Sequence, residues 1–308
     1  MSRQLDLFPR GSMGSPGSVE EDINADREIE LNTVDEIFSS DSRFRLSSKY
    51  IELLKFIARF PNYSTFNCFL MYIQNSEVSC VATARTWARK HRRRPRVAAR
   101  PLIILAPMAP VRFVYDLKDT EGQPVPENMF QPLKPRTGYL TRVYETTLHN
   151  CGVQGISVHE TRLNRGSTDT ATRITPALRK KNKNLNPKKD SSYLILLNQE
   201  FGLAARYSSL AYELGHIFCG HLGIDTNAWW PERGGLNVSE EEIEAGSVAY
   251  LVTQRMGLFA DAQKYLDDLT SGIPEIPAMS LNAVLQAVTY VEDMGKLRWG
   301  VPKRRSRY

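Results

Sequence analysis

The 308-residue sequence lacks the features that mark several specialised classes of protein. No stretch approaches the roughly 18 consecutive apolar residues of a membrane-spanning helix, and no charged and then apolar signal peptide opens the chain. Its four cysteines (Cys68, Cys80, Cys151 and Cys219) do not have the paired spacing of metal ligands. We therefore expect buried thiols, a reducing compartment and a cytoplasmic protein with no membrane association.

The bulk composition is that of a folded protein rather than a disordered one. Hydrophobic residues make up 42% of the chain, which is sufficient for packed cores, and 308 residues are enough for two domains. The formal net charge of +6 is modest. What matters for partners is therefore where the positive charge is concentrated.

The first part of the chain predicts a tail and then a small domain. Residues 1–40 are Gly/Ser-rich and then acidic, so we expect a disordered tail, and residues 7–12 resemble a protease-cleavage linker added to the protein. A first domain is predicted over 41–135, and the proline-rich segment 120–135 marks its end. Apolar periodicity and capping residues predict helices over 50–58, 66–73 and 82–91, followed by strands over 101–107 and 111–115.

The second domain is predicted over 136–308 and ends in a basic tail. Its expected elements are a helix over 138–149, strands near 156–159 and 193–197, a long helix that includes 210–218, and helices over 240–256 and 281–297. The fold class that we predict for the whole chain is α+β.

One helix contains most of a metallopeptidase motif. Residues 210–222 read LAYELGHIFCGHL, and positions 212 and 216 share a helix face with Glu213 beside them. This is the spacing of H-E-x-x-H, in which two histidines bind zinc and the glutamate activates the metal-bound water. In this chain the first histidine is replaced by Tyr212.

A zinc peptidase needs three protein ligands and an open position for water. His216 is one candidate. Glu244 is a second, because it leads directly into a small, apolar helix face, whereas the alternative is that all the acids of 240–244 lie at a solvated helix start and favour the helix dipole. His221 lies five residues beyond His216, about 140° round a helix, so we expect it outside the same coordination sphere.

A basic segment in the first domain is a candidate nucleic-acid site. Its cations are interleaved with or close to aromatic residues, so that charges can follow phosphates while rings stack on bases. The alternative is an ordinary solvated basic loop. The candidate DNA-binding residues are Tyr63, Trp87, Arg89, Lys90, Arg92, Arg93, Arg94 and Arg96.

These motifs together resemble a known family. Residues 210–222 and 244–250, with the Trp229-Trp230-Pro231 loop, are similar to the metallopeptidase domain of ArdC-type antirestriction proteins, which are related to ImmA/IrrE peptidases. The resemblance covers roughly 42–257 and implies an N-terminal single-stranded-DNA-binding domain followed by a zincin-like domain. The upstream motifs that carry it are Tyr63-Ser64, Gln74-Asn75, 81–83, Trp87, 104–107 and 114–116.

The resemblance also implies roles for individual residues. His216 and Glu244 would be zinc ligands and Glu213 the general base, whereas Tyr212 departs from the family pattern, as does Gly246, where relatives tend to have an acid. A phenol binds zinc only as phenolate, and its ordinary pKa is near 10. Three interpretations remain open: a natural pseudoenzyme, an engineered inactive form, or an altered site in which Tyr212 is a poor ligand.

Two functions follow as hypotheses. The first is a DNA-binding protein with a zinc metalloendopeptidase domain, a hydrolase of an unidentified protein substrate, whose activity is weak or absent because of Tyr212. The second is a non-catalytic antirestriction protein that coats single-stranded DNA and in which the peptidase fold is only structural.

Overall fold

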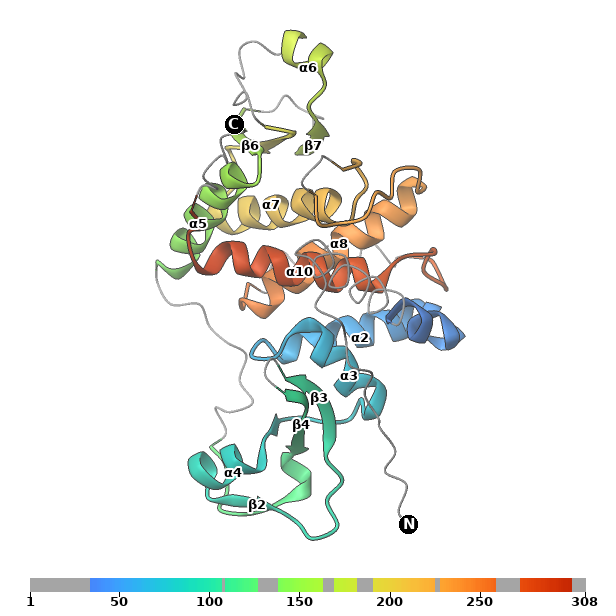
Figure 1. Ribbon diagram of the computed structural model, residues 1–308, viewed down its shortest axis with the longest axis vertical. Coiled ribbons are helices and arrows are strands. Elements are labelled where there is room, and N and C mark those ends of the chain that lie inside the picture. Colours follow the sequence, from blue (N-terminus) through green and yellow to red (C-terminus); the bar gives the residue numbers. More distant parts are fainter. Residues whose placement is uncertain are drawn as a thin grey trace, which may run out of the picture.

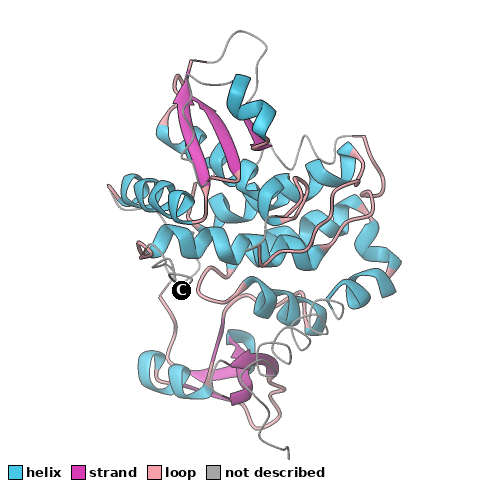
Figure 2. Cartoon of the chain, turned by 45° about the horizontal axis from the view of Figure 1, so that its top comes forward, coloured by secondary structure: helices cyan, strands magenta, loops and turns pink. Residues whose placement is uncertain are grey.

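The computed structural model describes residues 34–106, 109–126, 138–162, 169–181, 191–224, 228–258 and 272–300. The fold is mixed α+β, as predicted. Two groups of strands lie at opposite ends of the molecule with a layer of helices between them (Figures 1 and 2). The elements in chain order are η1 (Ser42–Arg45), α2 (Ser47–Arg59), α3 (Thr65–Gln74), β1 (Val81–Ala82), α4 (Ala84–His91), β2 (Arg93–Pro95), β3 (Leu102–Ala106), β4 (Ala109–Asp116), η2 (Leu117–Asp119), β5 (Thr120–Gly122), α5 (Tyr139–Val153), β6 (Ile156–Thr161), β7 (Thr170–Arg173), α6 (Pro176–Lys181), β8 (Tyr193–Asn198), α7 (Leu203–Phe218), α8 (Val238–Arg255) and α10 (Leu281–Lys296).

The first group of strands forms two small antiparallel sheets. One has the order β1-β4-β3, and the other pairs β2 with β5. Helix α4 begins where the Thr83 hydroxyl accepts a hydrogen bond from the Thr86 N–H, and it ends at Arg92, which has the left-handed φ of 51°. The chain therefore passes directly from α4 into β2, so that the basic segment forms a helix end and a strand rather than a loop.

Side-chain amides of α3 close the outer edge of β3. Gln74 donates to the Ile103 carbonyl at 2.8 Å and accepts from the Ile103 N–H at 2.8 Å, while Asn67 makes the same two bonds with Leu105 at 3.1 and 2.9 Å. Asn67 and Gln74 are seven residues apart on one helix face, which matches alternate residues of the strand. This edge is therefore not open to pairing with another strand.

The second sheet has the order β6-β8-β7, with β8 parallel to β6 and antiparallel to β7. From chain order alone, Tyr193–Leu197 is expected to be a strand whose edge pairs with an extended peptide. That expectation is wrong, because this strand is β8 and both of its edges are already paired. Among the described strands, β6 and β7 are the two edges of this sheet, and β7 packs against α7.

Helices α7, α8 and α10 form the packed layer beneath this sheet (Figure 1). Helix α8 begins with a capping box, in which the Asn237 side chain accepts from the Glu240 N–H and the Glu240 side chain accepts from the Asn237 N–H. Helices α7 and α8 approach closely at Gly215, where an added Cβ would lie 3.0 Å from the Ala245 Cα. Small residues at this crossing therefore set the separation of the two motif-bearing helices.

Helices α2 and α3 pack onto the same layer from the other side. The Tyr50 and Ser247 hydroxyls are 2.7 Å apart, and the Thr65 hydroxyl donates to the Leu285 carbonyl at 2.9 Å. Apolar residues of both halves of the chain belong to one buried cluster. The predicted boundary at 135–136 lies outside the described residues, so the two-domain division stays a prediction.

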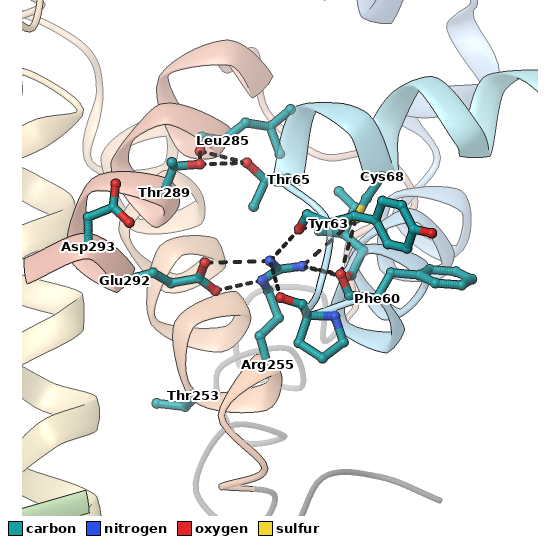
Figure 3. A network of polar contacts seen from close by, with 12 residues as sticks. Phe60, Tyr63, Thr65, Cys68, Thr253, Arg255, Leu285, Thr289, Glu292 and Asp293 are labelled. Atoms are coloured by element: carbon teal, nitrogen blue, oxygen red, sulfur yellow. Dashed lines mark hydrogen bonds and ion pairs between the residues drawn. The ribbon is translucent and has the colours of Figure 1, made fainter. Parts of the chain in front are cut away.

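A buried guanidinium joins the two halves (Figure 3). Arg255, at the end of α8, donates to the Ile57 carbonyl at 3.0 Å, to Phe60 at 3.1 Å and to Tyr63 at 2.8 Å. It also pairs with Glu292 of α10, with 2.6 Å between Nε and Oε1. Ile57 lies in the last turn of α2, and Phe60 and Tyr63 follow its end, so the arginine adds a charged donor to carbonyls at and beyond the helix terminus.

None of the described helices is long and apolar enough to cross a membrane. The four cysteines form no disulfide. Cys68, Cys151 and Cys219 are buried and Cys80 is half-buried, which confirms the expectation of buried thiols for three of the four.

Candidate functional site

The altered motif position faces a carboxylate that the motif itself does not include. Tyr212, Glu213 and His216 lie on α7, and the Tyr212 hydroxyl donates a hydrogen bond to the Glu242 carboxylate on α8. The rings of Tyr212 and His216 are in edge contact, with centroids 5.0 Å apart. Glu242, rather than Glu244, is therefore the acid of α8 that Tyr212 contacts.

Glu244 points into the protein, as predicted, but toward a cation. Both of its oxygens accept from the Arg233 guanidinium, with 2.6 Å between Nη2 and Oε1. His221 Nε2 lies 2.9 Å from Oε2, and the Ser280 N–H donates to Oε1 at 2.7 Å. The Glu244 side chain has no exposed surface. The carboxylate predicted as a zinc ligand is thus held in a buried ion-pair network.

His221 lies beside His216, contrary to the expectation that the two diverge. Their Nδ1 atoms are 3.0 Å apart, so one ring donates to the other. Helical rotation does not separate them, because α7 ends at Phe218 and the chain turns back at Gly220, whose φ is +85°. An added Cβ at Gly220 would collide with the Pro231 carbonyl, so glycine is required at this turn.

Burial shifts the pKa values of two titratable groups of the motif helix. Burial raises the pKa of Glu213 to about 8; the Ala171 N–H opposes this shift, and the charges of Asp169 and Glu242 add to it. Glu213 is therefore largely protonated at pH 7. Burial, together with His221, lowers the pKa of His216 to about 4, which leaves this imidazole neutral.

Glu244 behaves in the opposite way to Glu213. Burial raises its pKa, but the hydrogen bonds from His221 and Arg233 outweigh that effect and hold the pKa below the ordinary value. Glu244 is therefore an anion at neutral pH, and its charge is compensated within the protein.

Among the residues that the structure describes, one group of donor atoms could hold a metal ion, and it differs from the predicted one. The ligand atoms of Cys219, His221 and Glu244 all lie within 4.8 Å of one another and are buried. A metal would have to displace Arg233 from Glu244, and burial raises the pKa of the Cys219 thiol well above its ordinary value. The predicted set of Tyr212, His216 and Glu244 fits a metal poorly, because Tyr212 and Glu244 are each bound to other partners.

The predicted basic segment is largely exposed. Arg89 and Lys90 occupy the last turn of α4, and Arg92, Arg94 and Arg96 project from the chain that follows. Within the described parts of the chain, Arg94 is the one of these five that forms an ion pair, with Glu121 of β5 at 2.9 Å. These side chains are in position to meet an anionic partner.

Three other residues assigned to the DNA site are anchored in the fold. Arg93 donates to the Thr120 side chain at 2.8 Å and to its carbonyl at 2.7 Å. The Trp87 indole is fully buried and donates to the Tyr115 carbonyl at 2.9 Å, so its predicted stacking on a base does not hold in this structure. Tyr63 is half-buried, and its hydroxyl donates to the Val81 carbonyl at 2.8 Å.

Sequence reasoning missed an exposed apolar face on the β3–β4 hairpin. Ile103, Leu105, Val111 and Phe113 are all more than two-fifths exposed. The available signal was that β3 is apolar at all five positions, Leu102–Ala106, whereas a strand that covers one core needs apolar residues on one face only.

Comparisons with known proteins gave a limited result. No protein-family model and no curated protein matches the chain. Two solved structures of the antirestriction protein ArdC from plasmid R388 are similar, both at 14% identity. The Mn(II)-bound structure has a TM-score of 0.34 and covers 80% of this chain and 94% of its own. The metal-free structure has a TM-score of 0.32 and covers 74% and 81%. These are structures of the protein type that the sequence motifs resemble, but at such TM-scores function has to be argued from this chain's own residues.

Proposed function

We propose that this protein binds single-stranded DNA as an antirestriction-type protein, and that its zincin-like centre does not hydrolyse peptides. The observation that carries the proposal is the exposed basic surface formed by Arg89, Lys90, Arg92, Arg94 and Arg96, which we call the α4–β2 basic surface. Lysine and arginine in such a group bind phosphates and release counterions, so affinity falls as salt rises.

The geometry of the centre supports the non-catalytic part. Tyr212 donates to Glu242 where a competent site would present a lone pair. Arg233 occupies both oxygens of Glu244, and Glu213 carries a proton at neutral pH. In a competent relative, a bound zinc would polarise a peptide carbonyl and activate water for the motif glutamate. In this chain Tyr212 and Glu244 of the predicted donor set are held by other partners.

The test of DNA binding is the salt dependence of affinity. Binding of a labelled oligo-dT is measured by fluorescence anisotropy at several salt concentrations, for the wild type and for Arg89→Ala/Arg92→Ala/Arg96→Ala. We expect weaker binding and a salt slope reduced by roughly 0.7 for each phosphate that the variant no longer neutralises. Arg162→Ala, which removes an exposed arginine from the far sheet, is the control. An unchanged slope in the triple variant would refute the assignment.

A second candidate function is a metal-dependent endopeptidase with an altered site. The buried cluster of Cys219, His221 and Glu244 favours it, since these metal-ligating groups lie close together. Elemental analysis of the purified protein beside Tyr212→His decides between the two. Near-stoichiometric zinc or manganese in the wild type would support the peptidase and justify a search for its protein substrate. Metal in Tyr212→His alone would support a disabled centre.

The free cysteines agree with the cytoplasmic location that we propose, because buried unpaired thiols are typical of reducing compartments. The proposed partner is single-stranded DNA, which an incoming plasmid or phage would bring into the same compartment.

A further inference from the structure

We infer that the bases of the bound strand stack on the exposed face of the β3–β4 hairpin, with Phe113 as the principal stacking residue. This inference rests on the proposed function and adds to it the place and the chemistry of base contact. It replaces Trp87, whose ring is buried.

The face is defined by strand alternation. Phe113 is 51% exposed and lies directly opposite Ile103, which is 45% exposed, across the β3–β4 pair. Val111 and Leu105 extend the same face and are 42% and 44% exposed. We call these four residues the hairpin face. The intervening residues Leu102, Ile104 and Val114 are buried on the other side. Successive residues of a strand point to opposite faces, so the exposed set forms one surface.

An exposed apolar surface of this kind marks a binding site more often than a plain solvent face. Phe113 supplies an aromatic ring, and the aliphatic neighbours give a flat apolar floor beside it. A nucleobase has an aromatic face of the same character and stacks on such a ring whatever its sequence. Contact with nucleobases is therefore more favourable for the hairpin face than contact with water.

The structure argues against an extended peptide as the occupant. Strand addition needs a free edge, and the edge of β3 is closed by Asn67 and Gln74, which bond the N–H and carbonyl groups of Leu105 and Ile103. On its other edge, β4 pairs with β1 at Tyr115 and Asp116. Strand addition is therefore excluded at β3, and a partner that contacts all four side chains of the hairpin face has to lie across the face.

Charge complementarity argues for a nucleic-acid strand. Strand β4 continues through η2 into β5, which pairs with β2, so the hairpin and the α4–β2 basic surface belong to one connected unit (Figure 1). The Trp87 indole bonds the Tyr115 carbonyl of β4 and so holds α4 against the strand that carries Phe113. A single strand can thus place phosphates on the cations and bases on the hairpin face.

The experiment separates base contact from phosphate contact. Anisotropy titrations compare an oligo-dT of roughly 16 nucleotides with an abasic deoxyribose-phosphate oligomer of the same length. The variants are Phe113→Ala and Phe113→Tyr, which keeps an aromatic ring. Phe201→Ala is the matched control, because Phe201 is 45% exposed and follows β8 in the other sheet. Circular dichroism spectra and sedimentation velocity are recorded for every variant.

We expect Phe113→Ala to weaken oligo-dT binding by roughly 5- to 150-fold, the range for loss of one stacked base, and to leave binding of the abasic oligomer unchanged. Phe113→Tyr should retain affinity, and Phe201→Ala should match the wild type. Unchanged oligo-dT binding by Phe113→Ala would overturn the inference while the proposed function stands. So would an equal loss on both oligomers, or a wild-type dimer that Phe113→Ala dissociates. Failure of the wild type to bind either oligomer would instead refute the proposed function.

Discussion

Replacing Arg233 with methionine should destabilise the protein by about 3–5 kcal/mol, the cost of leaving one partner of a buried ion pair without its counterion. The Glu244 side chain has no exposed surface and Arg233 is 17% exposed, so water replaces little of the lost interaction. Of the partners in the described parts of the chain, His221 and the Ser280 N–H would remain on the carboxylate. Both oxygens of Glu244 lose a charged donor, and bidentate hydrogen bonds between charged groups are among the stronger ones in proteins.

A double-mutant cycle tests whether this cost belongs to the pair. Glu244→Met removes the buried anion as well, and an apolar pair of similar volume is often close to neutral relative to the ion pair. We therefore expect Arg233→Met/Glu244→Met to be more stable than Arg233→Met alone.

The dependence of the free energy of unfolding on acid pH is a second test of the Arg233–Glu244 pair. The folded pKa of Glu244 lies below its unfolded value, so its contribution is present above about pH 4.5 and is lost as pH falls through the folded pKa. In Arg233→Met the free energy of unfolding should therefore fall less steeply as the pH is lowered through this range.

The assay is urea denaturation followed by far-UV circular dichroism at pH 7, repeated toward acid. Arg162→Met is the control, because the Arg162–Glu200 pair is exposed and such pairs contribute little. The reasoning is refuted if Arg233→Met stays within about 1 kcal/mol of the wild type, or if the double variant loses the sum of the two single losses.

Three further predictions concern other buried groups. Because the pKa of Glu213 is raised to about 8, the folded state holds a proton that the unfolded state releases near pH 4.5. The free energy of unfolding of the wild type should therefore fall as pH rises between these values, by at most about 1.4 kcal/mol per pH unit. Urea denaturation should show that Glu213→Gln removes this slope. Arg255→Met should lower stability by about 3–5 kcal/mol in the same assay, since it leaves the Glu292 carboxylate without its counterion and removes a charged donor from several carbonyls. A loss below about 1 kcal/mol would count against the network of Figure 3. Asn67→Ala/Gln74→Ala should open the β3 edge and promote association, which sedimentation velocity measures and which Phe201→Ala should not reproduce.

The local elements could be predicted because their signals are local. Capping by Ser64 and apolar spacing predict a helix over 66–73, and the structure has α3 at Thr65–Gln74. The sheet order could not be predicted in this way. Strand β8 is central because β6 and β7, which follow one another in the chain, both pair with it and not with each other. An apolar run indicates that a strand is buried and does not identify its neighbours.

The misassignment of Trp87 has a different cause. Its basic neighbours suggested an exposed segment, but helix α4 turns by about 100° per residue, so Arg85 and Arg89 can face solvent while Trp87 faces inward. The charge of a segment indicates which way most of its side chains point, and does not fix the direction of one aromatic residue within it. Helical periodicity is the better guide for single positions.

The two acids of α8 show why a metal ligand is hard to assign from a motif alone. Glu242 and Glu244 are two residues apart, about 200° round the helix, so they must face different surroundings. The inference that Glu244 is buried was correct, but its partner Arg233 comes from a loop, and no periodic pattern announces that contact. The exposed acid Glu242 is the one that Tyr212 reaches. A histidine at position 212 would offer a lone pair to a metal beside Glu242, whereas the phenol offers a proton. In this structure the Glu242 carboxylate is therefore a hydrogen-bond acceptor for Tyr212.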